Sequence, residues 1–236
     1  LETLIALYYN VMDVRPGDPH WEDRDRFIMS KGHCCPALYA VLADKGYFGK
    51  EELATLRKLG SHLQGHPDMR KTPGVDANTG SLGQGIAIAM GMALAAKHAM
   101  KDYRVFTLVG DGECQEGLVW EAAMSAAHYK LDNFTVIMDH NRLQIDGDND
   151  DVMSLGDIMG KFAAFGFDTY KVDGHDIDAV TAALKAPFTP GRPKFVCCET
   201  VKGKGVSFME NKASWHGSTI KQADYEAAIK ELKEAL

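Results

Sequence analysis

The sequence predicts an α/β protein whose mostly parallel sheet is covered by helices on both faces. Two observations indicate this class: short, mostly apolar runs are typical of buried strands, and segments of helical period separate these runs. Strands joined through helices form right-handed βαβ units and so lie parallel in one sheet. The 236 residues contain no repeat and no low-complexity linker, so we expect a single domain over residues 1–236.

Four apolar runs are the predicted strands. They span residues 105–109, 134–138 and 194–198, with a further run around residues 167–172. Helical periodicity predicts the covering layers, at residues 118–129, 155–165 and 177–186 in the second half, and at residues 1–12, 37–45 and 51–58 in the first.

The segment 82–100 has a distinctive composition. It is apolar nearly all round and rich in glycine and alanine, which permit close contact with a neighbour. We expect this helix to be buried on most sides, partly against another subunit. It falls short of the about 20 apolar residues that span a bilayer, because Gln84, Lys97 and His98 interrupt it.

Charge and cysteine content narrow the class of protein further. The formal net charge of −7 argues against nucleic acid or an anionic membrane as a partner. The five cysteines show neither a CxxC metal pattern nor a disulfide framework: Cys34, Cys35, Cys114, Cys197 and Cys198. We therefore expect reduced, mostly buried thiols in a cytoplasmic protein.

Oxygen-bearing side chains follow two successive predicted strands. Gly110-Asp111-Gly112-Glu113 follows the predicted strand at residues 105–109. Asp139-His140-Asn141 follows the next predicted strand, at residues 134–138. Because a parallel sheet gathers ligands at the carboxyl ends of its strands, Asp111 and Asn141 can converge. Carboxylate and carboxamide oxygens suit Mg²⁺, with Ca²⁺ or Mn²⁺ as alternatives, and the glycines allow a diphosphate to approach. The tripeptide Gly-Asp-Gly alone is typical of a turn between a strand and a helix. Asn141 at the end of the next strand favours a metal site instead.

This combination resembles the signature of thiamine diphosphate enzymes, and along essentially the whole chain it is similar to the transketolase branch. The resemblance implies that Asp111, Asn141 and the main-chain carbonyl of Leu143 hold the metal. Gly112, which permits close backbone approach, and Glu113, which lies close to the metal ligand in sequence, are further candidate cofactor-binding residues.

Further motifs carry the same resemblance. Ser30-Lys31-Gly32-His33 is similar to the segment whose histidine, here His33, reaches the cofactor phosphates and the reaction centre. Gly65-His66-Pro67 matches a motif whose histidine, His66, contacts the donor sugar. The loop 79–85 resembles one whose Gly80 and Leu82 positions line the cofactor pocket.

The remaining matched positions lie later in the chain. Glu116 corresponds to an acid that bonds the catalytic glutamate across the subunit interface, and Ile145 to a residue packed on the cofactor rings. Lys202, in a glycine-rich loop, and His216, in Ser214-Trp215-His216-Gly217, match residues that reach the diphosphate. The resemblance thus implies four catalytic residues: His33, His66, Glu116 and His216.

The implied activity is transfer of a two-carbon ketol unit from a ketose phosphate to an aldose phosphate, with thiamine diphosphate and Mg²⁺ as cofactors. The family's pyrimidine-binding domain, which supplies the catalytic glutamate, has no counterpart in these residues. We expect it on a separate chain or downstream. The hypothesis is an N-terminal subunit of a split transketolase, assembled as a dimer of heterodimers.

Three other functions remain open at this point. The equivalent part of a 1-deoxyxylulose-5-phosphate synthase shares the cofactor, but the Ser-Trp-His-Gly and Gly-His-Pro motifs favour transketolase. A non-catalytic subunit is disfavoured by retention of the metal and histidine positions. A nicotinamide-binding enzyme is disfavoured because no GxGxxG follows an early strand.

Overall fold

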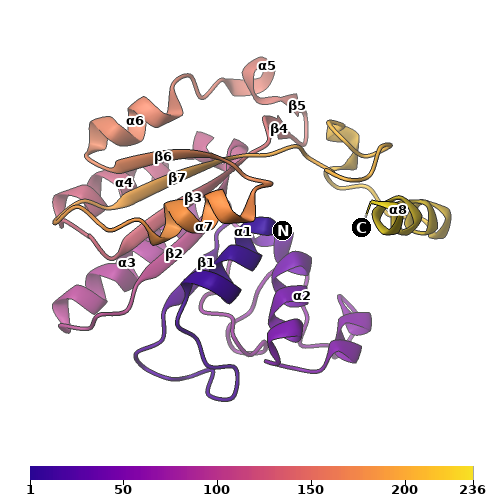
Figure 1. Ribbon diagram of the computed structural model, residues 1–236, viewed down its shortest axis with the longest axis horizontal. Coiled ribbons are helices and arrows are strands. Elements are labelled where there is room, and N and C mark those ends of the chain that lie inside the picture. Colours follow the sequence, from indigo (N-terminus) through magenta and orange to yellow (C-terminus); the bar gives the residue numbers. More distant parts are fainter. Residues whose placement is uncertain (236) are drawn as a thin grey trace.

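The computed structural model describes residues 1–235 and contains one five-stranded parallel sheet (Figure 1). Its order is β1-β2-β3-β7-β6, and each neighbouring pair is parallel. The strands are β1 (Arg26–Met29), β2 (Val105–Gly110), β3 (Phe134–His140), β6 (Asp168–Asp173) and β7 (Lys194–Glu199). The α/β class is confirmed, and all four predicted strands are present.

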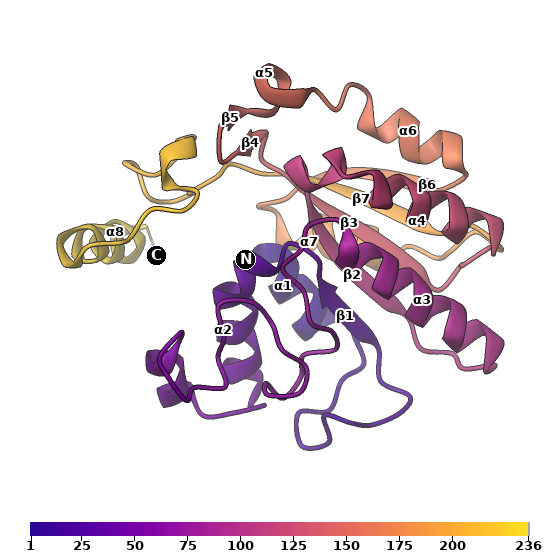
Figure 2. The same cartoon turned by 180° about the vertical axis from the view of Figure 1, so that it is seen from behind.

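Helices cover both faces of the sheet (Figures 1 and 2). One face carries α1 (Glu2–Ile5), which continues as a π-helix (Ala6–Val11), then α2 (Cys35–Lys45) and α7 (Ile177–Lys185). The other carries α3 (Gln84–His98), α4 (Gly117–His128) and α6 (Ile158–Phe165). Short elements complete the chain: the hairpin β4 (Leu143–Gln144) and β5 (Gly147–Asp148), α5 (Asn149–Met153), and 3₁₀-helices at Gly32–Cys34, Lys50–Thr55, Gly112–Gln115 and Ala213–Trp215.

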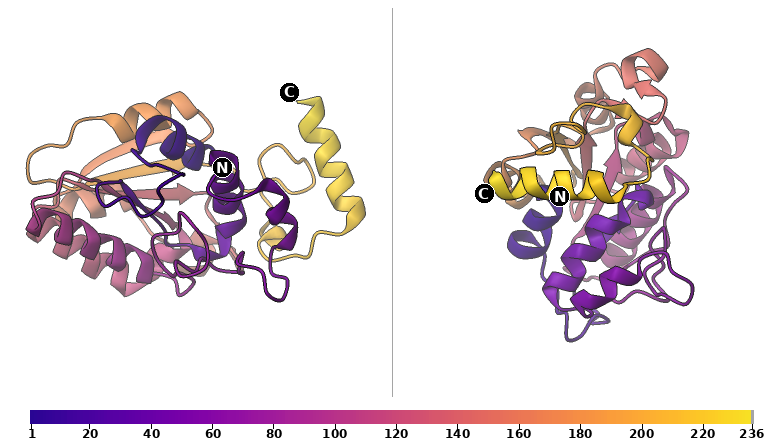
Figure 3. Two further views of the ribbon diagram at one scale, coloured as in Figure 1. Left: turned by 90° about the horizontal axis from the view of Figure 1, so that it is seen from below. Right: turned by 90° about the vertical axis from the view of Figure 1, so that its right-hand side faces the viewer.

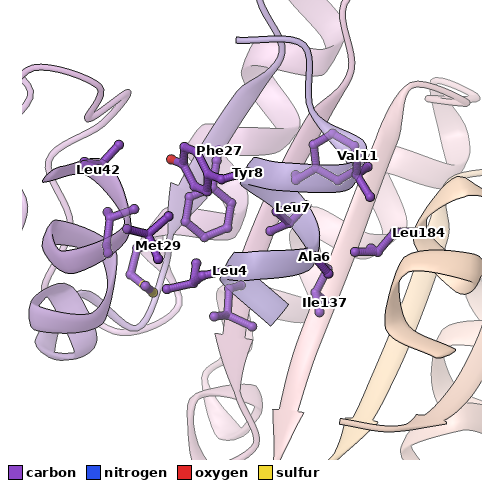
Figure 4. Close-up of a cluster of buried hydrophobic side chains, with 14 of the residues drawn as sticks. Leu4, Ala6, Leu7, Tyr8, Val11, Phe27, Met29, Leu42, Ile137 and Leu184 are labelled. Atoms are coloured by element: carbon purple, nitrogen blue, oxygen red, sulfur yellow. The ribbon is translucent and has the colours of Figure 1, made fainter. Parts of the chain in front are cut away.

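Each face of the sheet has its own apolar core. Successive strand residues point to opposite faces, so Phe106 and Ile137 enter the core beneath α1 and α7, whereas Val105 and Val136 enter the core beneath α3 and α4. Figure 4 shows Leu4 and Leu7 of the N-terminal helical segment in the first of these cores. This double burial explains why the central strands β2, β3 and β7 are mostly apolar rather than alternating.

The last helix, α8 (Gln222–Glu234), lies away from the sheet (Figure 3). None of its residues is buried. The carboxylate of Glu231 accepts hydrogen bonds from the main-chain N–H and hydroxyl of Ser207, at 2.6 and 2.9 Å, and so ties α8 to the preceding loop.

Two local predictions differ from the structure. The predicted helix over residues 51–58 is a 3₁₀-helix over Lys50–Thr55, and the chain reverses at Arg57, which has a φ of 61°. Strand β1 is not predicted, because only three apolar residues follow Arg26 and they merge into a polar loop. The structure shows that β1 is the edge strand that carries that loop.

Helix α3 is buried on one side only among the described residues. Gly85, Ile86, Ala89, Ala93 and Ala96 face the sheet, whereas Ile88 is 37% exposed and Gly91 is also exposed. The expectation of burial on most sides is therefore not met within one chain. All five cysteines are free thiols and only Cys34 is not fully buried, as expected. No helix among the described residues is long and apolar enough to cross a membrane.

Candidate active site at the carboxyl edge of the sheet

Four loops gather at the carboxyl ends of neighbouring strands. They follow β1 (residues 30–33), β2 (residues 111–113), β3 (residues 141–143) and β7 (residues 200–202). The chain leaves β3 for the far edge strand β6 and returns to β7 beside β3, so the sheet has its topological switch point between β3 and β7. Such a point is where open parallel sheets bind ligands.

The two predicted metal ligands are tied together by the main chain. Asp111 is 2% exposed; its Oδ1 accepts from the N–H of Gly112 at 2.7 Å and its Oδ2 from the N–H of Arg142. Asn141 Oδ1 accepts from the N–H of Leu143 at 3.0 Å. Arg142, between Asn141 and Leu143, has a left-handed φ of 64°. This value is strained for a non-glycine residue, and such strain is typical of functional sites. The two strand ends therefore converge as predicted.

A partly buried ion pair lies beside this loop. The Lys31 ammonium contacts the Asp139 carboxylate, which also accepts from the hydroxyl of Thr200. Burial alone would lower the pKa of Lys31, but the attraction of Asp139 outweighs it and holds the pKa above its ordinary value. The same pair holds the pKa of Asp139 well below its usual range despite burial. Lys31 thus stays charged and joins β1, β3 and β7 at the edge of the site.

Three more basic groups surround the site. The rings of His33 and His216 stack with centroids 5.3 Å apart and planes 29° apart. Burial, then the charges of Lys202 and His33, lower the pKa of His216 to about 4. Burial and Lys31 likewise lower the pKa of His33. After burial, the charges of Lys31 and Lys202 contribute to both shifts, so the positive charge of the site comes from these two lysines, as an anion-binding site requires.

Glu113 joins its own loop to the loop after β1, to the residue before α3 and to the end of β2. It is 2% exposed, and its Oε1 accepts from the Ser30 hydroxyl at 2.5 Å and the Gly83 N–H at 2.9 Å. Its Oε2 accepts from the Gly110 N–H at 3.0 Å. Because protein donors take up both oxygens, Glu113 holds the loops in place, a role that differs from the predicted contact with the cofactor.

The loop with Gly80 meets the loop with His66. Gly80 has a φ of 146°, and a Cβ placed on it would stand 3.0 Å from the His66 ring. A Cβ on Gly32 would stand 2.7 Å from Thr79 Oγ1, so the loop after β1 reaches the same place. The structure therefore brings together the loops that carry Gly32, His66 and Gly80.

The other predicted residues lie at the rim. Leu82 is 38% and Ile145 66% exposed. Glu116 is exposed at the start of α4, with its Cβ 2.8 Å from the position of a Cβ on Gly83. These three side chains face outward from the described chain, which suits the predicted contacts with a ring or a partner.

The site has the donor set that a metal-bound diphosphate needs. Carboxylate and amide oxygens at Asp111 and Asn141 match a hard divalent cation, and Lys202, His33 and His216 can meet the anion. His216 Nδ1 is buried and has no hydrogen-bond partner among the described residues, so a donor there is available. A Cβ on Gly112 would stand 3.2 Å from the Gln144 side chain, so this part of the loop packs tightly and favours glycine. These residues fit the implied cofactor.

Sequence reasoning assigned no role to several residues of the site. Lys31 and Ser30 lie in the Ser-Lys-Gly-His motif, but nothing in the spacing pairs them with Asp139 and Glu113. His175 also belongs here: its Nε2 accepts from the Val201 N–H at 2.8 Å and its Nδ1 contacts Glu2 at 2.9 Å. It therefore orients the loop that carries Lys202, and only the fold reveals this contact.

A second cluster with metal-ligand chemistry lies nearby. One ligand atom each from His140, Cys197 and Glu199 falls within 4.8 Å of the others. Glu199 already binds the ammonium of Lys171 and the guanidinium of Arg142. Two cations on the only carboxylate make this cluster a charge-compensated network rather than a metal centre.

Comparison with known proteins agrees with this geometry. Residues 2–236 match the family model described as "Transketolase, thiamine diphosphate binding domain". The chain is 43% identical over 237 residues to an apulose-4-phosphate transketolase subunit from Phocaeicola vulgatus, covering 100% of this chain and 84% of that protein. It is also 43% identical over 233 residues to the 6-deoxy-6-sulfo-D-fructose transketolase subunit of a Clostridium species, covering 98% of this chain and 85% of that protein.

Larger relatives share the same fold. The solved transketolase of Leishmania mexicana superimposes with a TM-score of 0.91 at 34% identity. That match covers 98% of this chain but 36% of the other. Human transketolase is 41% identical over 233 residues, which is 37% of its length. The chain therefore spans little more than a third of these longer proteins.

Proposed function

Because the chain belongs to the transketolase family, we propose that it is the N-terminal, diphosphate- and metal-binding part of a thiamine diphosphate-dependent transketolase. A second chain or domain completes the active site. The observation that carries the proposal is the convergence of Asp111 and the Asn141–Leu143 turn beside the cluster of Lys202, His33 and His216. Oxygen ligands and basic groups on one sheet edge suit a cation–diphosphate pair.

Each group of residues has a distinct task in this proposal. Asp111, Asn141 and the carbonyl of Leu143 hold Mg²⁺, with Ca²⁺ or Mn²⁺ as alternatives. Lys202 neutralises charge on the diphosphate, His216, which is uncharged near pH 7, hydrogen-bonds it, and Gly112 lets it approach the backbone. Gly80, Leu82 and Ile145 line the pocket for the rings.

Thiamine diphosphate, when bound, supplies an electron sink for cleaving the carbon–carbon bond next to a carbonyl. The protein's own groups then handle protons and oxygens. His33 has a lowered pKa and is neutral near pH 7, so it can accept or donate a proton at a substrate oxygen. His66, exposed beside Gly80, can hydrogen-bond a hydroxyl of the donor sugar.

The substrates and the partner follow the relatives in this proposal. Two of them are named as subunits of transketolases that act on a sugar phosphate or a sulfonated sugar. A complementary subunit supplying the catalytic glutamate fits the exposed Glu116 and the exposed side of α3. In this proposal the two chains form a dimer of heterodimers in the cytoplasm. The substrate is then a ketose that carries an anionic group.

Cofactor binding by the isolated chain tests the proposal first. Titration calorimetry with thiamine diphosphate should show binding that requires Mg²⁺ and is abolished by Asp111→Ala. Asp102→Ala is the matched control: Asp102 is exposed and precedes the amino end of β2, opposite the carboxyl ends that carry the site, so this variant should bind as the wild type does. Equal binding by the Asp111→Ala protein would remove the central claim.

Activity then separates the related reactions. With its complementary chain, the protein should transfer a ketol unit from xylulose 5-phosphate to ribose 5-phosphate, or from a related anionic ketose. Turnover of pyruvate in place of a ketose would instead identify a deoxyxylulose phosphate synthase. Cofactor binding without turnover by any pairing would identify a non-catalytic protein.

A further inference from the structure

Asn149, the first residue of α5, has a buried amide that lacks hydrogen bonds. The residue is 4% exposed, and neither its Oδ1 nor its Nδ2 has a partner within residues 1–235. Buried polar side chains nearly always have at least one partner, and an unpaired buried amide destabilises the fold. An apolar side chain of similar shape would avoid that cost. The unpaired amide therefore indicates a binding role, in which a ligand supplies the missing hydrogen bonds.

The position of Asn149 indicates what that function is. Its main-chain N–H donates to the carbonyl of Arg142 at 2.9 Å, inside the turn between Asn141 and Leu143. Its Oδ1 lies 3.7 Å from the position of a Cβ on Gly112, next to Asp111. Asn149 thus contacts both strand-end loops that carry the proposed metal ligands.

We propose that Asn149 is an additional ligand-binding residue, whose amide hydrogen-bonds the hydrated metal–diphosphate group. A carboxamide offers both a donor, for an anionic oxygen, and an acceptor, for a metal-bound water. The ligand class is therefore a hydrated divalent cation with a diphosphate, since a cation alone would leave the donor unused. This inference rests on the proposed function and adds a residue that approaches from the start of α5 rather than from the carboxyl end of a strand of the five-stranded sheet.

The proposal predicts opposite effects on stability and on binding. In Asn149→Leu the unpaired amide is gone, so the melting temperature of the free protein should stay unchanged or rise. The dissociation constant for thiamine diphosphate with Mg²⁺ should increase about tenfold, as it does when a supporting hydrogen bond to a metal site is removed. A residue with a purely structural role would lower the melting temperature instead.

Calorimetric titration and thermal unfolding monitored by circular dichroism measure these two quantities. A higher dissociation constant without a lower melting temperature supports the role of Asn149. An unchanged dissociation constant overturns it, and so does a lower melting temperature, because the amide would then be satisfied without the cofactor. Asn149→Ala, which adds no atoms, is judged by the same criteria if the leucine does not fit.

Two controls separate this proposal from the previous one. Asn10→Ala, on the N-terminal π-helix, should leave cofactor affinity unchanged. If the wild-type protein binds thiamine diphosphate with Mg²⁺ and Asn149→Leu binds equally well, only the role of Asn149 fails. If the wild-type protein does not bind, the proposed function itself fails.

Discussion

Replacing Glu113 with glutamine should loosen three loops of the site at once. The carboxylate joins the Ser30 hydroxyl after β1, the Gly83 N–H before α3 and the Gly110 N–H at the end of β2. All three partners are donors, so the site needs acceptors at both oxygens of residue 113. Glutamine has the same shape but presents one NH₂ group, which must face a donor.

The magnitude follows from these contacts. Hydrogen bonds to a charged group contribute about 1.5–3 kcal/mol each. Glutamine loses at least one bond outright and weakens the others by losing the charge. Against this, removing a buried charge recovers part of its desolvation cost. We expect a net loss of about 2–4 kcal/mol, a large share of the about 5–15 kcal/mol that stabilises a typical domain.

Urea unfolding and amide hydrogen exchange measure this effect. Glu113→Gln should lower the urea midpoint and speed exchange at Gly83 and Gly110, the two amides bonded to the carboxylate. Glu121→Gln, exposed on α4, is the matched control and should stay within about 0.5 kcal/mol of the wild type. Adding Ser30→Ala to Glu113→Gln should cost less than the sum of the single changes, because the two side chains share a bond.

The reasoning fails if Glu113→Gln unfolds at the wild-type urea midpoint with unchanged exchange at Gly83 and Gly110. Such a result would mean that the loops are held by their own backbone and that the carboxylate is incidental. Additive effects of Ser30→Ala and Glu113→Gln would likewise show that the 2.5 Å contact contributes no coupling.

Three further predictions concern pH, core stability and association. The folded-state pKa of His216 is about 4, below the ordinary 6.5. As the pH falls from 6.5 to 4, the unfolded chain therefore binds a proton at this histidine before the folded chain does, and the folded state loses stability. His216→Gln should make urea unfolding less sensitive to acid in that range. The buried carboxylate of Asp76 pairs with the guanidinium of Arg24 and accepts a hydrogen bond from the N–H of Phe27 at 2.8 Å. Asp76→Ala should therefore lower the free energy of unfolding by about 3–5 kcal/mol in denaturant titrations. Ile88→Glu, on the exposed side of α3, should weaken self-association in analytical ultracentrifugation without lowering the melting temperature.

The central strands could be predicted because burial on both faces leaves a clear pattern. A run such as residues 134–138 is mostly apolar, with Thr135 as its one polar residue, since Val136 enters one core and Ile137 the other. The placement of Asp111 and Asn141 follows from that pattern, because a parallel sheet brings successive strand ends to one edge. The metal-ligand part of the candidate site was therefore accessible from the sequence.

Contacts between residues far apart in the chain could not be predicted in this way. Ser30 and Glu113, and likewise Lys31 and Asp139, meet only because β1 and β2 pair in a definite register and β3 lies next to β2. Strand β1 itself is too short for its periodicity to distinguish it from a loop. Nothing in the sequence shows that Glu113 points inward to three donors while Glu116, on the same loop, points outward.

In the free protein, the buried charged groups and the buried neutral polar groups of the site differ in whether they have a partner. Lys31 is paired with Asp139, and Glu113 has three donors, whereas the amide of Asn149 and Nδ1 of His216 have no partner in residues 1–235. This division is expected, because an unpaired buried charge costs far more than an unpaired neutral group. Lys202 is the intermediate case: burial and then the charge of Lys31 lower its pKa. A bound diphosphate would reverse that shift, so Lys202 should gain more from the cofactor than Lys31, whose charge Asp139 already compensates.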